Sequence, residues 1–221
     1  ILQRASCLRA LGRAEEAVPL VRERLAAGSD LGIELQLELA RCYTALKDYP
    51  AALAAYRELL ERGSGQLPLG AYLGRAEAYY ALGMHDEGAV DALGFLRRCS
   101  IPNTHPGRVL RAATLLWPRS HLYERELRAT LRRFRDELAD SPASNPESAS
   151  WLVRLAWLQD RAGDQAEALR TLSSPQLEPL EDPEAVLAQA RRQLGQGESS
   201  PALAQLVERL DATRVGLRGP R

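Results

Sequence analysis

The sequence has few aromatic residues, and it has no excess of charge of either sign. Phe, Trp and Tyr make up 5% of 221 residues, and 29 Lys and Arg are balanced by 29 Asp and Glu. A net charge of zero provides no overall field that would attract nucleic acid or an anionic membrane. Lys47 is the only lysine, so the cations are almost all arginine. The abundance of Ala, Leu, Arg and Glu favours helices over strands.

Long apolar runs and paired cysteines are also missing. No stretch approaches the roughly 18 apolar residues that a membrane-spanning helix needs, so we expect no direct membrane insertion by this chain. Cys7, Cys42 and Cys99 form no CxxC pair, and an odd number of cysteines makes no disulfide framework. We expect Cys7 and Cys42 to lie on packed helix faces as small buried residues.

The sequence lacks the usual motifs of catalysis. None of the histidines, His85, His105 and His121, has another ligand residue four positions away, and His121-Leu122-Tyr123-Glu124 lacks the second histidine of a zinc helix. There is no glycine-rich phosphate loop and no nucleophile elbow. Adjacent acids such as Glu15 and Glu16 are explained by the helix dipole at a helix start. The sequence therefore predicts a chain that is not an enzyme and that has no cofactor and no metal site.

What the sequence does have is a recurring helical turn. In Ala10–Ala17 an apolar helix ends at Leu11, Gly12 closes it, and an acidic first turn begins the next helix. The equivalent turn residues lie 35, 36, 80 and 34 positions apart: Gly12, Lys47, Gly83, Gly163 and Gly197. A small residue follows each of them five positions later: Ala17, Ala52, Gly88, Ala168 and Ala202. At Gly88 we expect unusually close contact between helices.

A period near 34 residues with these small residues resembles the tetratricopeptide repeat (TPR) family. Further residues of that pattern are Leu39, Ala40 and Tyr43 in the second repeat and Tyr72, Ala76 and Tyr79 in the third. The resemblance implies an all-α, right-handed solenoid of about five to six helix-turn-helix hairpins. The repeats are expected at about residues 1–29, 30–65, 68–99, 104–140, 147–174 and 182–212. Because the chain begins at Ile1 with no helix cap, and neither end has a polar capping repeat, we expect a segment of a longer protein.

The step of 80 residues predicts an atypical repeat at 104–140 with an extended second helix. Trp117-Pro118-Arg119-Ser120 replaces the usual turn, and Ser120 is a candidate N-cap. The helix after this turn, from about His121 to Ala139, carries Arg125, Arg128, Arg132 and Arg135 on one face. One interpretation of this face is a basic docking strip for an acidic partner. The other is a solvated face that neighbouring acidic residues partly neutralise.

Stacked hairpins leave a concave groove that the first helix of each hairpin lines. By resemblance to the TPR family, the groove is expected to be lined by Arg9, Glu34, Leu37, Arg41, Thr44, Leu73, Glu77, Tyr80, Val153, Trp157, Asp160 and Arg161. Leu2 and Ser6 belong to the same set. Apolar anchors and charges of both signs suit a protein partner. The expected function is therefore a non-catalytic scaffold for protein–protein interaction.

The Arg-rich, Lys-poor composition also resembles the periplasmic TPR region of the PelB family of exopolysaccharide export proteins. That resemblance implies a periplasmic location as part of an outer-membrane protein and a role in biofilm formation. It also implies a polysaccharide deacetylase/hydrolase of the PelA family as partner. Two other interpretations stay open. One is a cytoplasmic TPR adaptor or regulatory module of a larger protein, and the other is a solenoid that binds carbohydrate directly.

Overall fold

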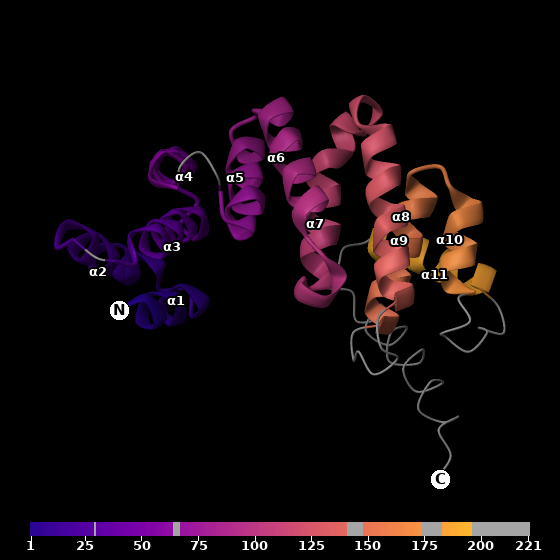
Figure 1. Ribbon diagram of the computed structural model, residues 1–221, viewed down its shortest axis with the longest axis horizontal. Helices are drawn as coiled ribbons and strands as arrows, with labels where there is room; N and C mark the ends of the chain where they lie inside the picture. Colours follow the sequence, from indigo (N-terminus) through magenta and orange to yellow (C-terminus); the bar gives the residue numbers. More distant parts are fainter. Residues whose placement is uncertain (29, 64–66, 141–147, 174–182, 196–221) are drawn as a thin grey trace, which may run out of the picture. The chain divides into compact units, whose positions relative to one another are not determined.

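The computed structural model describes residues 1–28, 30–63, 67–140, 148–173 and 183–195, and every regular element in these ranges is a helix (Figure 1). In chain order they are α1 Leu2–Ala10, α2 Ala14–Ala26, α3 Gly32–Ala45, α4 Tyr49–Arg62, α5 Leu69–Ala81, α6 His85–Arg98, the short 3₁₀ helix η1 Ile101–Asn103, α7 Pro106–Leu116, the 3₁₀ helix η2 Trp117–Leu122, α8 Glu124–Asp140, α9 Ser148–Arg161, α10 Gln165–Leu172 and α11 Pro183–Gly195. The predicted all-α class with helical hairpins is confirmed.

The chain forms two compact units. Unit 1 contains residues 1–98 and 114–119, and unit 2 contains residues 99–113 and 120–221. In unit 1, α1 packs against α2, α3 against α4, and α5 against α6, and the first helices also contact one another in the order α1, α3, α5. In unit 2, α9 packs against α8, α10 and α11. This nearest-neighbour packing is typical of a helical repeat array.

The recurring turn has the backbone geometry that its sequence predicts. Gly12, Gly83 and Gly163 have φ values of 76°, 77° and 79°, and Lys47 has a φ value of 60°. In the first turn the amide of Arg13 donates to the carbonyl of Leu8 at 2.8 Å, and Gly12 donates to Arg9 at 3.1 Å. These two bonds make a Schellman motif, and the other three turns repeat both of them. The predicted fifth turn, at Gly197 and Ala202, lies outside the described residues.

Lys47 is the one non-glycine residue with positive φ in the described part of the chain. A left-handed conformation places Cβ of an L-residue against its own backbone, whereas glycine adopts it without that penalty. Replacing Lys47 with glycine should therefore raise the free energy of unfolding by about 1 kcal/mol. Urea denaturation followed by circular dichroism measures the change. Lys47→Ala keeps Cβ and is the matched control, so an equal gain from alanine would contradict this explanation.

The small residues after each turn allow helices to pack closely. Ala17, Ala52 and Ala168 are fully buried. At Gly88 a Cβ atom would lie 3.2 Å from the carbonyl oxygen of Ala76, so the close contact expected there is confirmed. These positions explain why the turn pattern predicts packing as well as chain reversal.

A second glycine contact, between consecutive hairpins, was not expected from the sequence. Any Cβ at Gly74, on α5, would collide with the hydroxyl of Tyr56 from α4 and would lie 3.1 Å from Cζ of the same ring. Tyr56 is fully buried, and its hydroxyl has no hydrogen-bond partner in the structure. The end of the Tyr56 ring therefore occupies the space that a side chain at position 74 would need.

The atypical region differs from the sequence prediction in how its long helix begins. The segment Trp117–Leu122 forms η2, and α8 begins at Glu124 rather than near His121. Ser120 lies inside η2, where its carbonyl accepts from the amide of Tyr123 at 2.9 Å, so its prediction as N-cap of the long helix was wrong. The opposite side of α8 from its exposed arginines forms a buried stripe, since Leu127, Leu131, Phe134 and Leu138 are all buried.

The cysteines divide into one exposed and two buried side chains. Cys42 and Cys99 are buried, and burial raises the pKa of their thiols to about 11 and about 12 respectively. Cys7 is exposed, so the expectation that it is packed like Cys42 was wrong. The two cysteines differ in their surroundings, because α3 packs against α1, α2, α4 and α5, whereas α1 packs against α2 and α3 within the described residues.

Candidate functional site

The predicted groove residues fall in both units. Those of α1, α3 and α5 lie in unit 1, and those of α9 lie in unit 2, so the two sets form separate candidate surfaces. In unit 1 the first helices contact one another in sequence, which brings Arg9, Arg41 and Glu77 onto neighbouring helices.

At the centre of the unit 1 set, two arginines share one buried carboxylate. Nε of Arg9 lies 2.7 Å from Oε1 of Glu38, and Nη1 of Arg41 lies 3.6 Å from Oε2 of the same side chain. The Glu38 side chain is 3% exposed, while those of Arg9 and Arg41 are 27% and 37% exposed. Because one carboxylate faces two guanidinium groups, the cluster has one formal positive charge in excess, and its arginines remain accessible to a partner.

The residues around this cluster are half-buried or exposed. Thr44 is half-buried, and its hydroxyl donates to the carbonyl of Ala40 at 2.9 Å. Leu37, Glu77 and Tyr80 are half-buried, and Glu34 is exposed. The ring of Tyr80 packs edge-on against His85 with centroids 4.4 Å apart. The surface of α1, α3 and α5 thus mixes charges of both signs with apolar and aromatic groups.

Three predicted groove residues are buried in this structure. Leu73, Val153 and Trp157 are 6%, 0% and 7% exposed, so placing them on an open groove was wrong. Each first helix in a stacked array is covered on more than one side, so a residue at a groove position can still be buried. Two other residues of α9 make internal contacts, since Arg161 lies over the Trp157 ring at 5.1 Å and Asp160 pairs with Arg191 at 2.7 Å.

Of the four arginines in the predicted basic strip of α8, two make ion pairs within the protein and two are exposed. Arg128 pairs with Glu124 at 2.5 Å and donates to the carbonyl of Ala162 at 3.1 Å, which satisfies a group at the end of α9. Arg135 pairs with Asp136 at 2.7 Å and also with Glu167. Arg125 and Arg132 are exposed. The docking prediction for this strip therefore rests on Arg125 and Arg132 alone.

Sequence reasoning missed Glu38 and the pairing of Arg75 with Asp91. Nε and Nη2 of Arg75, on α5, donate to the carboxylate of Asp91, on α6, at 2.6 and 2.7 Å. The available signal was the position of each acid on a helix face that is otherwise buried: Glu38 lies between Leu35 and Cys42 in the stripe of α3. Charged residues are rarely buried without a partner, so such a position indicates an ion pair.

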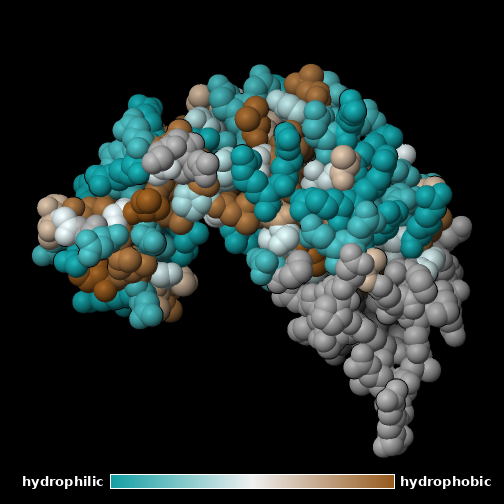
Figure 2. All heavy atoms as spheres, in the orientation of Figure 1, coloured by the Kyte–Doolittle hydropathy of each residue, from teal (hydrophilic) through white to brown (hydrophobic). Residues whose placement is uncertain are grey.

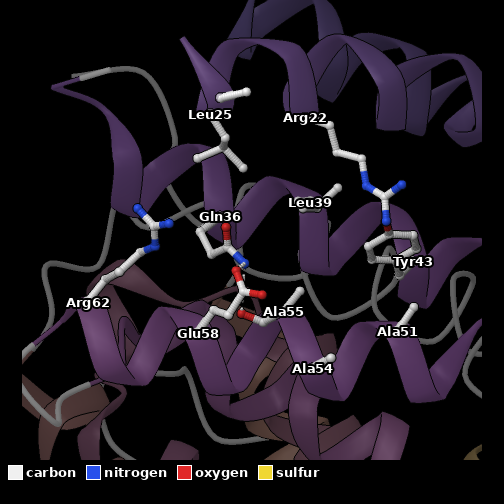
Figure 3. A pocket seen from close by; sticks show the side chains of 11 residues that line it. Arg22, Leu25, Gln36, Leu39, Tyr43, Ala51, Ala54, Ala55, Glu58 and Arg62 are labelled. Atoms are coloured by element: carbon white, nitrogen blue, oxygen red, sulfur yellow. Dashed lines mark hydrogen bonds between the residues drawn. The ribbon is translucent and has the colours of Figure 1, made fainter. Parts of the chain in front are cut away.

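An open pocket of about 340 Å³ lies between α2 and α4, with α3 as its floor (Figure 3). Three helices line it, with Arg22, Leu25 and Ala26 from α2, Gln36, Leu39 and Tyr43 from α3, and Ala51, Ala54, Ala55, Glu58 and Arg62 from α4. The amide of Gln36 donates to Glu58 at 2.9 Å, and the Arg22 guanidinium lies 5.6 Å from the centre of the Tyr43 ring. The sequence did not predict this pocket.

Two further features are absent from the described residues. In the ranges that the structure describes, no three His, Cys, Asp or Glu side chains are grouped to hold a metal ion. None of the described helices is both long enough and apolar enough to cross a membrane.

Comparison with known proteins identifies one hairpin. No curated protein and no solved structure matches the chain. Residues 34–62, which span most of α3 and all of α4, match the family model of the tetratricopeptide repeat. Arrays of this repeat typically bind proteins and are generally non-catalytic. The hairpin of α3 and α4 is thus similar to a tetratricopeptide repeat, and this similarity supports a place for the chain in the TPR superfamily as a protein-interaction scaffold.

Proposed function

We propose that this scaffold docks a polysaccharide-modifying enzyme, of the PelA family of periplasmic deacetylase/hydrolases, in a bacterial exopolysaccharide export system. The contact surface is that of α1, α3 and α5 in unit 1. The proposal is supported by the repeat match at residues 34–62 and by the resemblance of the Arg-rich, Lys-poor composition to the TPR region of PelB-family proteins. It places the chain in the periplasm, as part of a longer outer-membrane protein.

The observation that carries the choice of surface is the cluster of Arg9, Glu38 and Arg41. Its buried carboxylate holds Arg9 at 2.7 Å, so this guanidinium is ordered before any partner arrives. Arg41 is more exposed and its separation from Glu38 is longer, at 3.6 Å, so it is the freer of the two to pair with a partner's carboxylate. Exposed apolar residues accompany the charges, such as Ile33 beside Glu34, and Figure 2 shows hydrophobic side chains among hydrophilic ones near the N-terminal helices. Protein interfaces typically combine these features.

The direct test is binding of a purified PelA-family enzyme to residues 1–221 immobilised on a biosensor. We expect saturable binding that weakens as salt concentration rises. Arg41→Gln should weaken it about tenfold, because an arginine at the centre of an interface loses its carboxylate partner. This variant leaves Arg9 paired with Glu38, so the fold should be retained.

Arg24→Gln is the matched control, because Arg24 is exposed on α2 and takes no part in the cluster. It should bind as well as the wild-type chain does. Absence of binding to the enzyme would reject this partner, and equal binding by Arg41→Gln and Arg24→Gln would reject the surface. Binding of a hexosamine oligosaccharide in place of the enzyme would favour a solenoid that binds carbohydrate directly.

A further inference from the structure

The pocket between α2 and α4 lies on the opposite side of α3 from the surface that carries Arg41. Its α3 residues are Gln36, Leu39 and Tyr43. Each of them lies two positions after a predicted groove residue, which is about 200° around a helix. A ligand in the pocket therefore contacts a different face of the same repeat, and its binding does not depend on the export proposal.

The interior of the pocket suits an apolar side chain. Leu25 and Leu39 line it. The α4 residues opposite them have small side chains that leave space for a ligand: Ala51, Ala54 and Ala55. Its volume, about 340 Å³, is within the range of natural ligand sites. Leu39 is buried, Leu25 is half-buried and Ala54 is exposed, so the apolar surface reaches the opening.

The charged groups at the opening differ in whether they have a polar partner within the described residues. Arg22 on α2 and Arg62 on α4 are both exposed, and neither pairs with a carboxylate in the part of the chain that the structure describes. The carboxylate of Glu58 accepts a hydrogen bond from the buried Gln36 amide. Two unpaired guanidinium groups, one on each wall, thus frame the apolar interior (Figure 3). Guanidinium groups pair best with carboxylates, which they hold by two hydrogen bonds.

One polar group in the lining also lacks a partner. Tyr43 is 8% exposed, and its hydroxyl makes no hydrogen bond in the structure. A buried hydroxyl without a hydrogen-bond partner is energetically unfavourable. The hydroxyl is inaccessible to solvent, so the pocket meets Tyr43 through its ring, over which the Arg22 guanidinium lies.

We propose that this pocket binds an acidic segment of a protein partner. One apolar side chain of the segment occupies the space over Leu25 and Leu39, and carboxylates on either side of it pair with Arg22 and Arg62. Charge complementarity carries this choice of occupant, because two arginines and one glutamate at the opening leave one formal positive charge in excess. A basic or neutral segment would leave both guanidinium groups without a partner.

The test is selection from a random dodecapeptide display library against residues 1–221, with counter-selection on the Arg22→Glu/Arg62→Glu double variant. The expected enriched peptides have a net negative charge and at least one large apolar residue. Fluorescence anisotropy with the most enriched peptide, labelled with a dye, then measures its affinity. Arg22→Glu should weaken binding by at least about tenfold, since it replaces an attraction with a like-charge repulsion.

Three variants make the result specific. Arg24→Glu reverses an exposed charge two residues away on the same helix and should change the affinity less than about twofold. Tyr43→Phe removes only a hydroxyl that does not reach the pocket surface, so it should also change the affinity less than about twofold. Arg41→Gln, on the other face of α3, should leave peptide binding unchanged. Enrichment of basic or neutral peptides, no enrichment at all, or equal binding by the Arg22→Glu/Arg62→Glu variant would overturn the proposal.

Discussion

Replacing Gly74 with alanine is expected to lower the free energy of unfolding by about 1–3 kcal/mol, the cost of overpacking a well-filled core. The new methyl group would meet the Tyr56 hydroxyl, and this side chain is fully buried with no room to move away. Urea denaturation of the purified chain, followed by circular dichroism, measures the loss.

Combining Gly74→Ala with Tyr56→Phe tests whether the collision causes this loss of stability. Tyr56→Phe removes the atom that collides with the new methyl group and leaves Cζ at 3.1 Å, so the double variant should recover part of the lost stability. A double-mutant cycle reports this coupling directly. Gly32→Ala is the matched control, because that helical glycine has open space and only Nη1 of Arg62 at 3.9 Å. Additive effects of Gly74→Ala and Tyr56→Phe would show that the collision is not the cause.

Asp91→Ala should lower the free energy of unfolding by about 3–5 kcal/mol, the typical cost of removing one partner from a buried ion pair. Burial opposes the charge on Arg75, and the bidentate bond to Asp91 outweighs that effect and raises the pKa of Arg75 above its ordinary value. Without Asp91 the guanidinium, whose side chain is only 18% exposed, loses its counter-charge. Thermal and urea denaturation of the variant give the measurement.

Asp86→Ala controls for the general effect of deleting an acid from α6. Asp86 also pairs with an arginine, Arg119, at 2.5 Å, but its side chain is 72% exposed. Exposed pairs contribute about 0–1 kcal/mol, so this variant should change stability far less. Replacing both buried partners, as in Arg75→Met/Asp91→Leu, should recover most of the loss, because apolar groups of similar volume need no counter-charge. A similar loss from Asp86→Ala and Asp91→Ala would contradict the role given to burial.

The turn residues explain why the fold could be predicted from the sequence. Gly12, Lys47, Gly83 and Gly163 each reverse the chain by the same backbone geometry, and a small residue always lies at the same distance after them. Both features are local, so a single sequence displays them. The start of α8 could not be predicted in this way, because Pro118 permits a 3₁₀ segment as readily as a turn, and packing within the fold decides between them.

The candidate surfaces could be predicted only in part, since helical periodicity gives the faces of a helix but not what covers each face. Val153 and Trp157 share a face with Arg161, yet the first two are buried and Arg161 is exposed. The pairing of Glu38 with Arg9 joins residues 29 positions apart, and no local pattern indicates such a distance. The pocket of α2, α3 and α4 arises in the same way, from three helices whose separations depend on every residue between them.

The nearest-neighbour packing of the hairpins in unit 1 has a consequence for local unfolding. Within this sequence the hairpin of α1 and α2 has a neighbour on one side only, whereas the hairpin of α3 and α4 is held by α2 before it and α5 after it. A hairpin held on both sides opens less often than one at an end, because opening breaks two interfaces instead of one. Both proposed surfaces therefore share a hairpin whose backbone amides, in a chain of residues 1–221, should exchange with solvent more slowly than those of α1 and α2.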